Sequence, residues 1–234
     1  MVADLRPISV TPVLSRLVER LVVKYYIFST IQAENLFHQY GFKPTGSTTA
    51  ALVDITSTIS IMLEDNIYVR CLLIDFSKAF DSVNHLLPVS KLKLLKLPDN
   101  IIQWVVSFVT DREQFTKIGD RRSATRIITR SIVQGSGIGS ILFIIFVIDL
   151  RPLGLTNHIT KYADDTSLIV PEKADIDITA KLQHVLKWAE VNELNINTAK
   201  TKELVFHRPN PRNFIAPDNI PGIDRVTCAK LLGV

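Results

Sequence analysis

Hydrophobic residues follow two kinds of spacing along the 234-residue chain, one typical of helices and one typical of strands. Apolar residues recur every three or four positions in six stretches, which predicts helices over residues 14–31, 49–63, 84–97, 100–109, 140–150 and 176–191. Short apolar runs predict strands over residues 69–75 and 203–206, paired strands within 160–170, and a hairpin from 114–118 and 125–132. Because strands and helices do not alternate regularly, we predict an α+β fold rather than a doubly wound parallel sheet.

The composition limits the class of protein. With 47% hydrophobic residues the chain can bury a sizeable core, and its net charge of +4 permits a polyanionic partner. The two cysteines, Cys71 and Cys228, lack the spacing of metal ligands and predict a disulfide-free intracellular protein, with nucleus or cytoplasm left open. The longest apolar stretch, residues 141–148, is too short to cross a bilayer, so no membrane is expected as a partner.

Carboxylates stand at the ends of two apolar runs. Asp75 ends the run that begins at Cys71, and the pair Asp164-Asp165 lies between Tyr162-Ala163 and a second apolar run. Carboxylates at the end of a core strand are costly to desolvate, and three of them together repel one another unless a hard divalent cation binds them. Two such ions about 4 Å apart suit phosphoryl transfer. Taken alone, an Asp-Asp pair is also a common turn sequence, and that reading stays open at this point.

Three motifs in this order resemble those of reverse transcriptases. The first is Ile-Asp-Phe-Ser-Lys-Ala-Phe-Asp at 74–81, the second is Gln-Gly-Ser at 134–136, and the third is Tyr-Ala-Asp-Asp at 162–165. Further runs at 6–9 (Arg-Pro-Ile-Ser), at 41–48 and at 197–201 resemble other motifs of the same family. The similarity covers nearly the whole chain and is greatest to the non-LTR (LINE-like) retrotransposon branch.

The resemblance implies an RNA-directed DNA polymerase with a right-hand fold. Residues 1–68 would form mainly the fingers, and 69–234 mainly the palm, with a fingers-type insertion around 84–130. Such an enzyme adds dNTPs to a DNA primer on an RNA template and uses two Mg²⁺ ions, or Mn²⁺ in their place. The resemblance makes Asp75, Asp164 and Asp165 the metal-binding and catalytic residues.

The resemblance also implies roles for five other residues. Phe80 falls on the aromatic steric gate against ribonucleotides, and Lys200 on the lysine that approaches the leaving pyrophosphate. Gln134, Gly135 and Arg6 fall on positions that contact the incoming nucleotide or its triphosphate. From the residues alone, Phe80 can equally be a core side chain and Lys200 a solvated lysine at a helix end.

The sequence departs from the family at two places. Ser131-Ile132-Val133 precedes Gln134 where the family usually has Gly-Val-Pro. The chain also ends where the primer grip begins, so we expect the thumb to be missing and an endonuclease domain to accompany the full-length element.

Rival functions are weaker or remain open. A nucleotide hydrolase is disfavoured because Ser47 replaces the essential lysine of a phosphate-binding loop. Phe80 and Ala163 disfavour an RNA-dependent RNA polymerase. A noncatalytic or decayed retroelement fragment that only binds nucleic acid stays the alternative.

Overall fold

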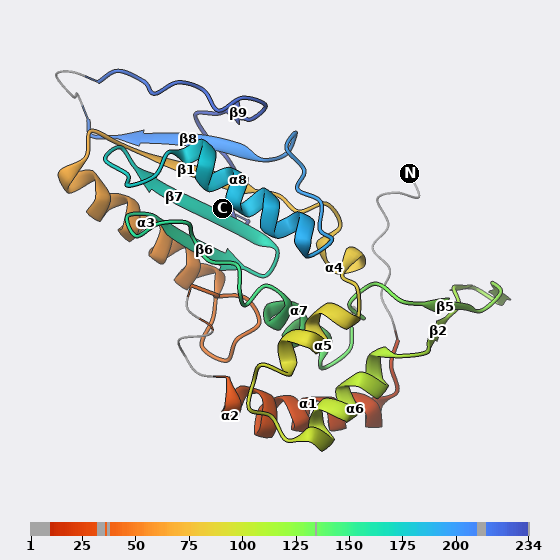
Figure 1. Ribbon diagram of the computed structural model, residues 1–234. Coiled ribbons are helices and arrows are strands. Elements are labelled where there is room, and N and C mark those ends of the chain that lie inside the picture. The colour runs from red at the N-terminus through yellow and green to blue at the C-terminus, as the bar shows by residue number, and fades with distance from the viewer. Residues whose placement is uncertain (1–9, 32–35, 37, 134, 210–213, 234) are drawn as a thin grey trace. The chain divides into compact units, whose positions relative to one another are not determined.

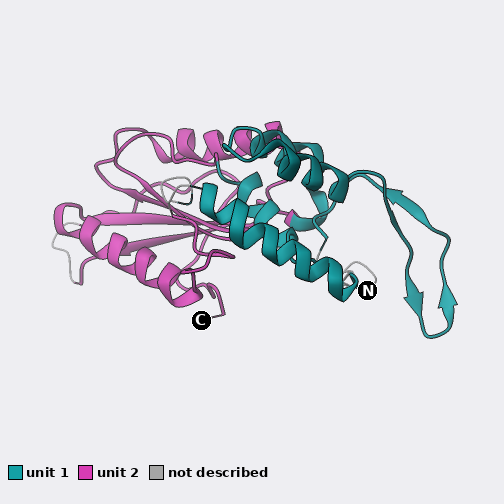
Figure 2. Ribbon diagram, turned by 90° about the horizontal axis from the view of Figure 1, so that it is seen from below, with its two compact units in different colours: residues 1–36, 80–148 teal, residues 37–79, 149–234 magenta. Residues whose placement is uncertain are grey.

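The chain forms two compact units, each built from two separate segments. The computed structural model describes residues 10–31, 36, 38–133, 135–209 and 214–233. Unit 1 comprises residues 1–36 and 80–148, and unit 2 comprises residues 37–79 and 149–234 (Figure 2). The assignment of fingers and palm to particular residues stays a prediction.

A five-stranded sheet forms the centre of unit 2. In sheet order its strands are β6 (His158–Tyr162), β7 (Asp165–Pro171), β1 (Tyr68–Ile74), β8 (Lys202–His207) and β9 (Asp224–Arg225) (Figure 1). The first four strands pair antiparallel, and β9 runs parallel to β8. The neighbours β7 and β1 therefore lie side by side although the second segment of unit 1, residues 80–148, separates them along the chain.

Helices cover both faces of this sheet. Helix α3 (Thr48–Asp65) lies on one face and α8 (Ile178–Val191) on the other (Figures 1 and 2). Each begins at a side-chain cap, where Ser47 accepts a hydrogen bond from the backbone N–H of Ala50 and Asp177 from that of Thr179. On the α3 face a cluster of buried apolar side chains joins helix to sheet: Ile55, Ile59, Val69, Cys71 and Ile169.

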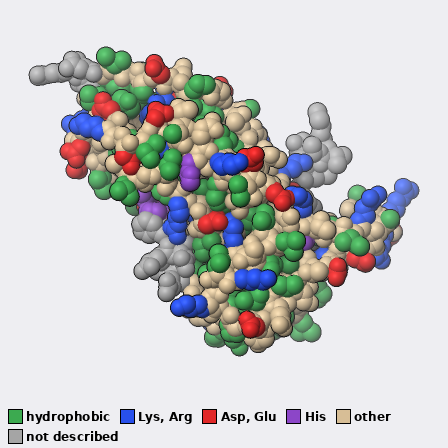
Figure 3. Space-filling view, viewed as in Figure 1, with side chains coloured by type: hydrophobic (Ala, Val, Ile, Leu, Met, Phe, Trp, Pro, Cys, Tyr) green, Lys and Arg blue, Asp and Glu red, His purple; other side chains and the backbone are tan. Residues whose placement is uncertain are grey.

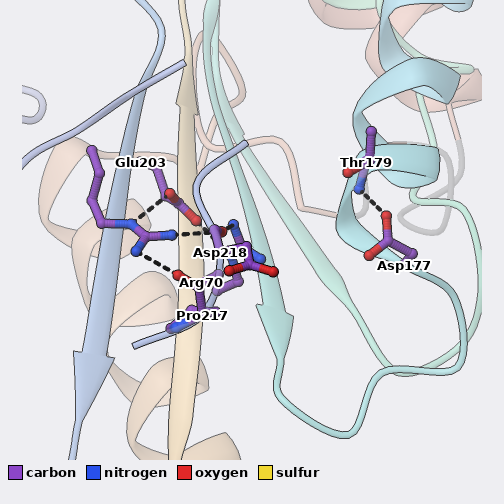
Figure 4. Close-up of polar contacts among 7 residues, drawn as sticks. Arg70, Asp177, Thr179, Glu203, Pro217 and Asp218 are labelled. Atoms are coloured by element: carbon purple, nitrogen blue, oxygen red, sulfur yellow. Dashed lines mark hydrogen bonds and ion pairs between the residues drawn. The ribbon is translucent and has the colours of Figure 1, made fainter. Parts of the chain in front are cut away.

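A buried ion network ties the last strand to the sheet (Figure 4). The Glu203 carboxylate is fully buried and lies 2.5 Å from Nε of Arg70 and 2.8 Å from Nε of Arg225. Both guanidinium groups also donate to the backbone carbonyl of Asp218. Glu203 thereby holds the segment around β9 against strands β1 and β8.

Unit 1 is mainly helical. It contains α1 (Val13–Val22), the π-helical turn η2 (Val23–Ile27), α2 (Phe28–Thr30), α5 (Leu86–Leu92), α6 (Asp99–Val109) and α7 (Gly139–Phe146), and α4 (Ala79–Ser82) begins at its boundary. Every residue of helix α7 except Ser140 is buried, so this helix forms the centre of the unit's core.

A basic two-tiered hairpin extends from unit 1. Strands β2 (Arg112–Gln114) and β5 (Arg126–Ile128) pair at its base, and β3 (Lys117–Ile118) and β4 (Arg121–Arg122) pair at its tip. Cationic side chains gather on this hairpin (Figure 3), and the tip residues Lys117, Arg121 and Arg122 are exposed.

The predicted elements are largely confirmed, with several differences, and the short elements α4 and β9 were not predicted. The helix expected over 84–97 is limited to Leu86–Leu92, and the helix expected over 14–31 contains the π-helical turn. The hairpin turns at Gly119-Asp120 as predicted, but its return strand begins at Arg121, four residues before the predicted start. Within the described part of the chain, no helix combines the length and the apolar character needed to span a membrane.

Candidate active site

A cavity of about 370 Å³ opens in unit 2 at the ends of β1 and β7. Three residues predicted from the sequence line it: Asp75, Asp165 and Lys200. The other lining residues are Leu73, Ile74, Thr166, Lys202, Val226, Cys228, Ala229, Lys230 and Leu231. The fold thus brings carboxylates and lysines from separate parts of the chain to one surface.

The strand register places Asp75 beside Asp165. Ile74, the last residue of β1, pairs with Thr166 of the antiparallel strand β7. One step further along both strands, Asp75 therefore stands opposite Asp165, at the separation of roughly 5 Å that is usual for cross-strand partners. Both residues line the cavity at the strand ends, while the apolar parts of both strands are buried in the sheet.

The segment that follows α8 fixes the backbone at Asp75. The backbone N–H of Asp75 donates to Thr201 Oγ1, and its carbonyl accepts from the backbone N–H of Asn197 at 2.8 Å. Thr201 is fully buried, whereas Lys200 beside it is exposed at the cavity. The run 197–201, singled out by the sequence, therefore lies next to the first carboxylate.

The Asp164-Asp165 pair lies in a tight turn between β6 and β7. Tyr162 pairs directly with Asp165, and Ala163 adopts the left-handed region at a φ of 56°. A non-glycine residue with this backbone conformation is strained and depends on its surroundings to hold it. Asp164 is half-buried and Asp165 is exposed.

Gln39 supports this turn, and the sequence did not single it out. Its buried side chain accepts hydrogen bonds at Oε1 from the backbone N–H groups of Gly41 (2.9 Å) and Ala163 (3.2 Å). A Cβ atom at Gly41 would lie 2.4 Å from the backbone nitrogen of Ala163, so only glycine allows this approach. The glycine of the run 41–48 was an available signal, but the partner turn could not be inferred from it.

The cavity combines both signs of charge. Lys200, Lys202 and Lys230 line it together with the two carboxylates, and Lys202 forms an ion pair at 2.8 Å with Asp224. Lysines beside carboxylates suit a polyphosphate that is bound together with a hard cation. The cation neutralises part of the negative charge of the phosphates, and the lysines neutralise the remainder.

The remaining predicted residues belong to unit 1 or lie outside the described residues. Phe80 is half-buried and stacks on Phe143, with ring centroids 4.2 Å apart and ring planes 18° from parallel. Gly135 has a φ of 100°, which favours glycine. Arg6 and Gln134 lie outside the described residues.

A buried carboxylate orders the loop that follows Gly135. Glu19 of α1 is fully buried and accepts hydrogen bonds from the backbone N–H groups of Gly137 (2.6 Å) and Ile138 (3.2 Å). These groups begin helix α7, where a negative charge is stabilising. The loop is held from within as well, since Ser136 Oγ accepts from the N–H of Gly139. Sequence reasoning missed Glu19, because nothing local marks it as different from other helical glutamates.

The donor set at the cavity fits a hard divalent metal ion. Asp75 and Asp165 supply carboxylate oxygens at the same opening, which are the ligands that Mg²⁺ and Mn²⁺ prefer. Both side chains retain access to solvent, so an ion bound there could keep part of its hydration.

Comparison with known proteins shows the family to which the chain belongs. The family model for "Reverse transcriptase (RNA-dependent DNA polymerase)" matches residues 2–234. Among curated Drosophila melanogaster proteins, the chain is 29% identical over 246 residues to one described as "Probable RNA-directed DNA polymerase from transposon BS", covering 98% of this chain and 27% of that protein. It is 28% identical over 214 residues to the "RNA-directed DNA polymerase from mobile element jockey", covering 86% and 23%. The chain thus spans about a quarter of the length of these relatives.

Solved telomerase structures share the fold. A Candida tropicalis apo telomerase truncated from its C-terminal domain matches with a TM-score of 0.61 at 13% identity, covering 86% of this chain and 42% of that one. A Candida albicans telomerase, solved with a TWJ fragment of telomeric RNA, matches with a TM-score of 0.57 at 15% identity, covering 85% and 34%. These matches confirm the predicted α+β polymerase fold. The family match and the transposon relatives confirm the predicted resemblance to polymerases of non-LTR retrotransposons, and the chain belongs to the reverse transcriptase family.

Proposed function

We propose that this chain is the catalytic core of an RNA-directed DNA polymerase, which adds dNTPs to the 3′ end of a primer on an RNA template. The observation that carries the proposal is the meeting of Asp75, Asp165 and Lys200 at one cavity. These are the residue types that phosphoryl transfer requires, since two carboxylates can hold metal ions and a lysine can neutralise the departing phosphate. The chain is proposed to act inside the cell, in agreement with its two free cysteines.

In the proposed chemistry the aspartates and Lys200 have different roles. Asp75, Asp164 and Asp165 would hold two Mg²⁺ ions, which supply Lewis-acid stabilisation of the attacking and leaving oxygens. Lys200 would place its ammonium group near the leaving pyrophosphate, where a positive charge offsets the charge that develops. The Gln39 contact would keep the Asp164-Asp165 turn in position, because it holds Ala163 in its strained conformation.

The basic hairpin of unit 1 supports a nucleic-acid partner. Its cations Lys117, Arg121, Arg122 and Arg126 are exposed, and Arg122 lies over the ring of Phe115 at 3.5 Å from its centroid. Exposed cations of this kind bind phosphates irrespective of sequence, and an enzyme that copies templates must accept any sequence. The RNA template and DNA primer are accordingly the proposed partners.

The experiment that tests the proposal is primer extension on an RNA template with single dNTPs in Mg²⁺. The proposal expects template-dependent addition that requires all three aspartates. Two results together would favour the alternative of a noncatalytic nucleic-acid-binding fragment. The chain would bind the template–primer, and any nucleotide addition that is detected would be unaffected by replacement of any of the three aspartates.

Replacing Phe80 by Val is expected to admit ribonucleotides. We propose that the Phe80 ring occupies the space that a ribose 2′-hydroxyl needs, so a smaller side chain should lower the dNTP-to-rNTP preference by about tenfold or more. Competitive incorporation of dNTP and rNTP measures the ratio. Because Phe80 stacks on Phe143, Phe143→Leu is the matched control: it disturbs the same pair of rings but should leave the ratio unchanged. Equal ratios in all three proteins would make Phe80 a packing residue only.

Replacing Gln39 by Leu is expected to reduce kcat for nucleotide addition by up to about 10²-fold, the effect of misplacing reacting groups by about 1 Å. The substitution leaves the N–H groups of Gly41 and Ala163 without their acceptor. Gln39→Glu keeps an acceptor oxygen and should recover most of kcat. Steady-state kinetics on RNA template–DNA primer, together with thermal melting, separate positioning from simple instability. Equal losses in the Leu and Glu variants would argue against a positioning role.

A further inference from the structure

A second cluster of possible metal ligands lies in unit 2 and contains no residue of the proposed active site. His38, Asp54 and His158 each offer one ligand atom, and these atoms all lie within 4.8 Å of one another. They come from three separate elements: the segment before α3, α3 itself and strand β6. All three side chains are half-buried, so the cluster lies partly within the fold and remains accessible to solvent.

The cluster is supported by hydrogen bonds to its carboxylate. Asp54 Oδ2 lies 2.8 Å from Nε2 of His158 and accepts a hydrogen bond of 2.5 Å from the Thr160 hydroxyl. The Tyr40 side chain also interacts with Asp54. The rings of His38 and His158 meet edge to face, with centroids 3.9 Å apart. Partners of this kind orient the ligands of metal sites and are themselves important for affinity.

Charged groups of both signs lie around the cluster. Asp54 supplies a negative charge, whereas Lys161 and Arg151 lie near enough to act on His38. The electrostatic field alone therefore does not attract a cation.

The backbone of His38 adopts an uncommon conformation. His38 has a φ of 60°, a region that few non-glycine residues adopt and that often marks functional sites. The segment that contains it runs beside β6, where the N–H of Lys161 donates to the carbonyl of His38 and the N–H of Tyr40 to that of Lys161. His38 and Tyr40 both lie near Asp54, while Gln39 between them reaches the Ala163 turn.

We propose that His38, Asp54 and His158 bind one divalent transition-metal ion, with Zn²⁺ as the best fit. Two imidazoles and one carboxylate are typical donors for zinc, with a fourth position left to water. Imidazole ligands disfavour Mg²⁺, which separates this site from the all-oxygen donors Asp75 and Asp165. Ligands on a tetrahedral zinc ion lie about 3.4 Å apart, given bonds of about 2.0–2.2 Å. The 2.8 Å separation of Asp54 Oδ2 and His158 Nε2 would therefore widen and the longer separations would shorten, with side-chain adjustments of about 1 Å.

The ion would join three elements of unit 2. It links the segment that carries Gln39 to α3 and β6, and Gln39 holds the turn before Asp164. Binding would stabilise the folded chain, because the ligands come together only there. The proposal does not depend on the polymerase activity.

The test is a titration of the metal-free 234-residue chain with Zn²⁺, and with Co²⁺ as a spectroscopic probe, in the presence of excess Mg²⁺. Cys228→Ser serves as the background, because an exposed thiol binds zinc by itself. We expect one Zn²⁺ per chain, visible Co²⁺ bands typical of four-coordinate nitrogen and oxygen ligands, and a rise in Tm with Zn²⁺. His158→Gln should weaken binding by at least about 100-fold, since even the loss of a supporting partner costs 10–100-fold. Thr160→Val removes only a supporting hydroxyl, so it should weaken Zn²⁺ binding by about 10–100-fold.

His207→Gln is the matched control, because His207 is an exposed histidine of the same unit. This variant should bind Zn²⁺ and Co²⁺ as the background protein does. The proposal is overturned if the folded background protein shows no stoichiometric Zn²⁺ and no Co²⁺ bands, a result that needs no variant to fold. It is also overturned if His158→Gln retains the affinity of the background protein.

Discussion

Asp75→Asn is expected to reduce single-nucleotide addition by about 10³-fold while template–primer affinity stays nearly unchanged. Asn keeps the volume of Asp but removes the charge that would bind the metal ions. Metal ions contribute several kcal/mol to stabilising the transition state of phosphoryl transfer. A loss of about 4 kcal/mol corresponds to about 10³-fold in rate. Single-turnover addition of one dNTP in Mg²⁺ measures the effect. Asp165→Asn should behave in the same way, because the two residues line the same cavity.

The readouts that separate metal loss from misfolding are Mn²⁺ binding by electron paramagnetic resonance and thermal melting. The Asp75→Asn variant should bind fewer Mn²⁺ ions and melt near the temperature of the parent chain. Asp99→Asn is the control, since Asp99 is an exposed carboxylate in the first turn of α6. Near-normal nucleotide addition by Asp75→Asn in Mg²⁺ would remove the basis of the proposed function.

Glu203→Gln is expected to lower the free energy of unfolding by about 3–5 kcal/mol, the usual cost of breaking a buried ion pair from one side. Glu203 is fully buried between Arg70 and Arg225, whose side chains are 11% and 22% exposed. A glutamine amide would leave both guanidinium charges without a carboxylate and would turn one N–H₂ group toward them. The loss would be a large share of a typical total stability of about 5–15 kcal/mol.

Urea unfolding followed by circular dichroism measures this effect. The control is Glu190→Gln, which breaks the exposed pair with Lys187 and should cost less than about 1 kcal/mol. A change of similar size in both variants would show that the Glu203 network contributes little. The network also bears on the cavity, because the segment held by Glu203 leads directly to the lining residues Val226 and Leu231.

The sequence by itself determined most of the elements and the family, and it supplied the residues of the candidate site as a prediction. The apolar runs that end at Asp75 and begin after Asp165 are strands as predicted, because a short apolar run bounded by polar residues is stable only when it is buried in a sheet. Helices α3, α6, α7 and α8 lie where the periodicity predicts them. The motifs and their order were enough to predict the family that the comparison confirms.

Only the tertiary structure decided which distant groups meet. Periodicity describes the residues near one another in the chain, whereas the pairing of β1 with β7 depends on the whole sheet. The contacts of Gln39 with Ala163, of Glu19 with Gly137 and of Glu203 with its two arginines join residues that no local pattern links. The cluster of His38, Asp54 and His158 was likewise hidden, since the five histidines show no ligand spacing along the chain. The role of a buried polar side chain depends on the partner with which it forms hydrogen bonds, and the fold determines that partner.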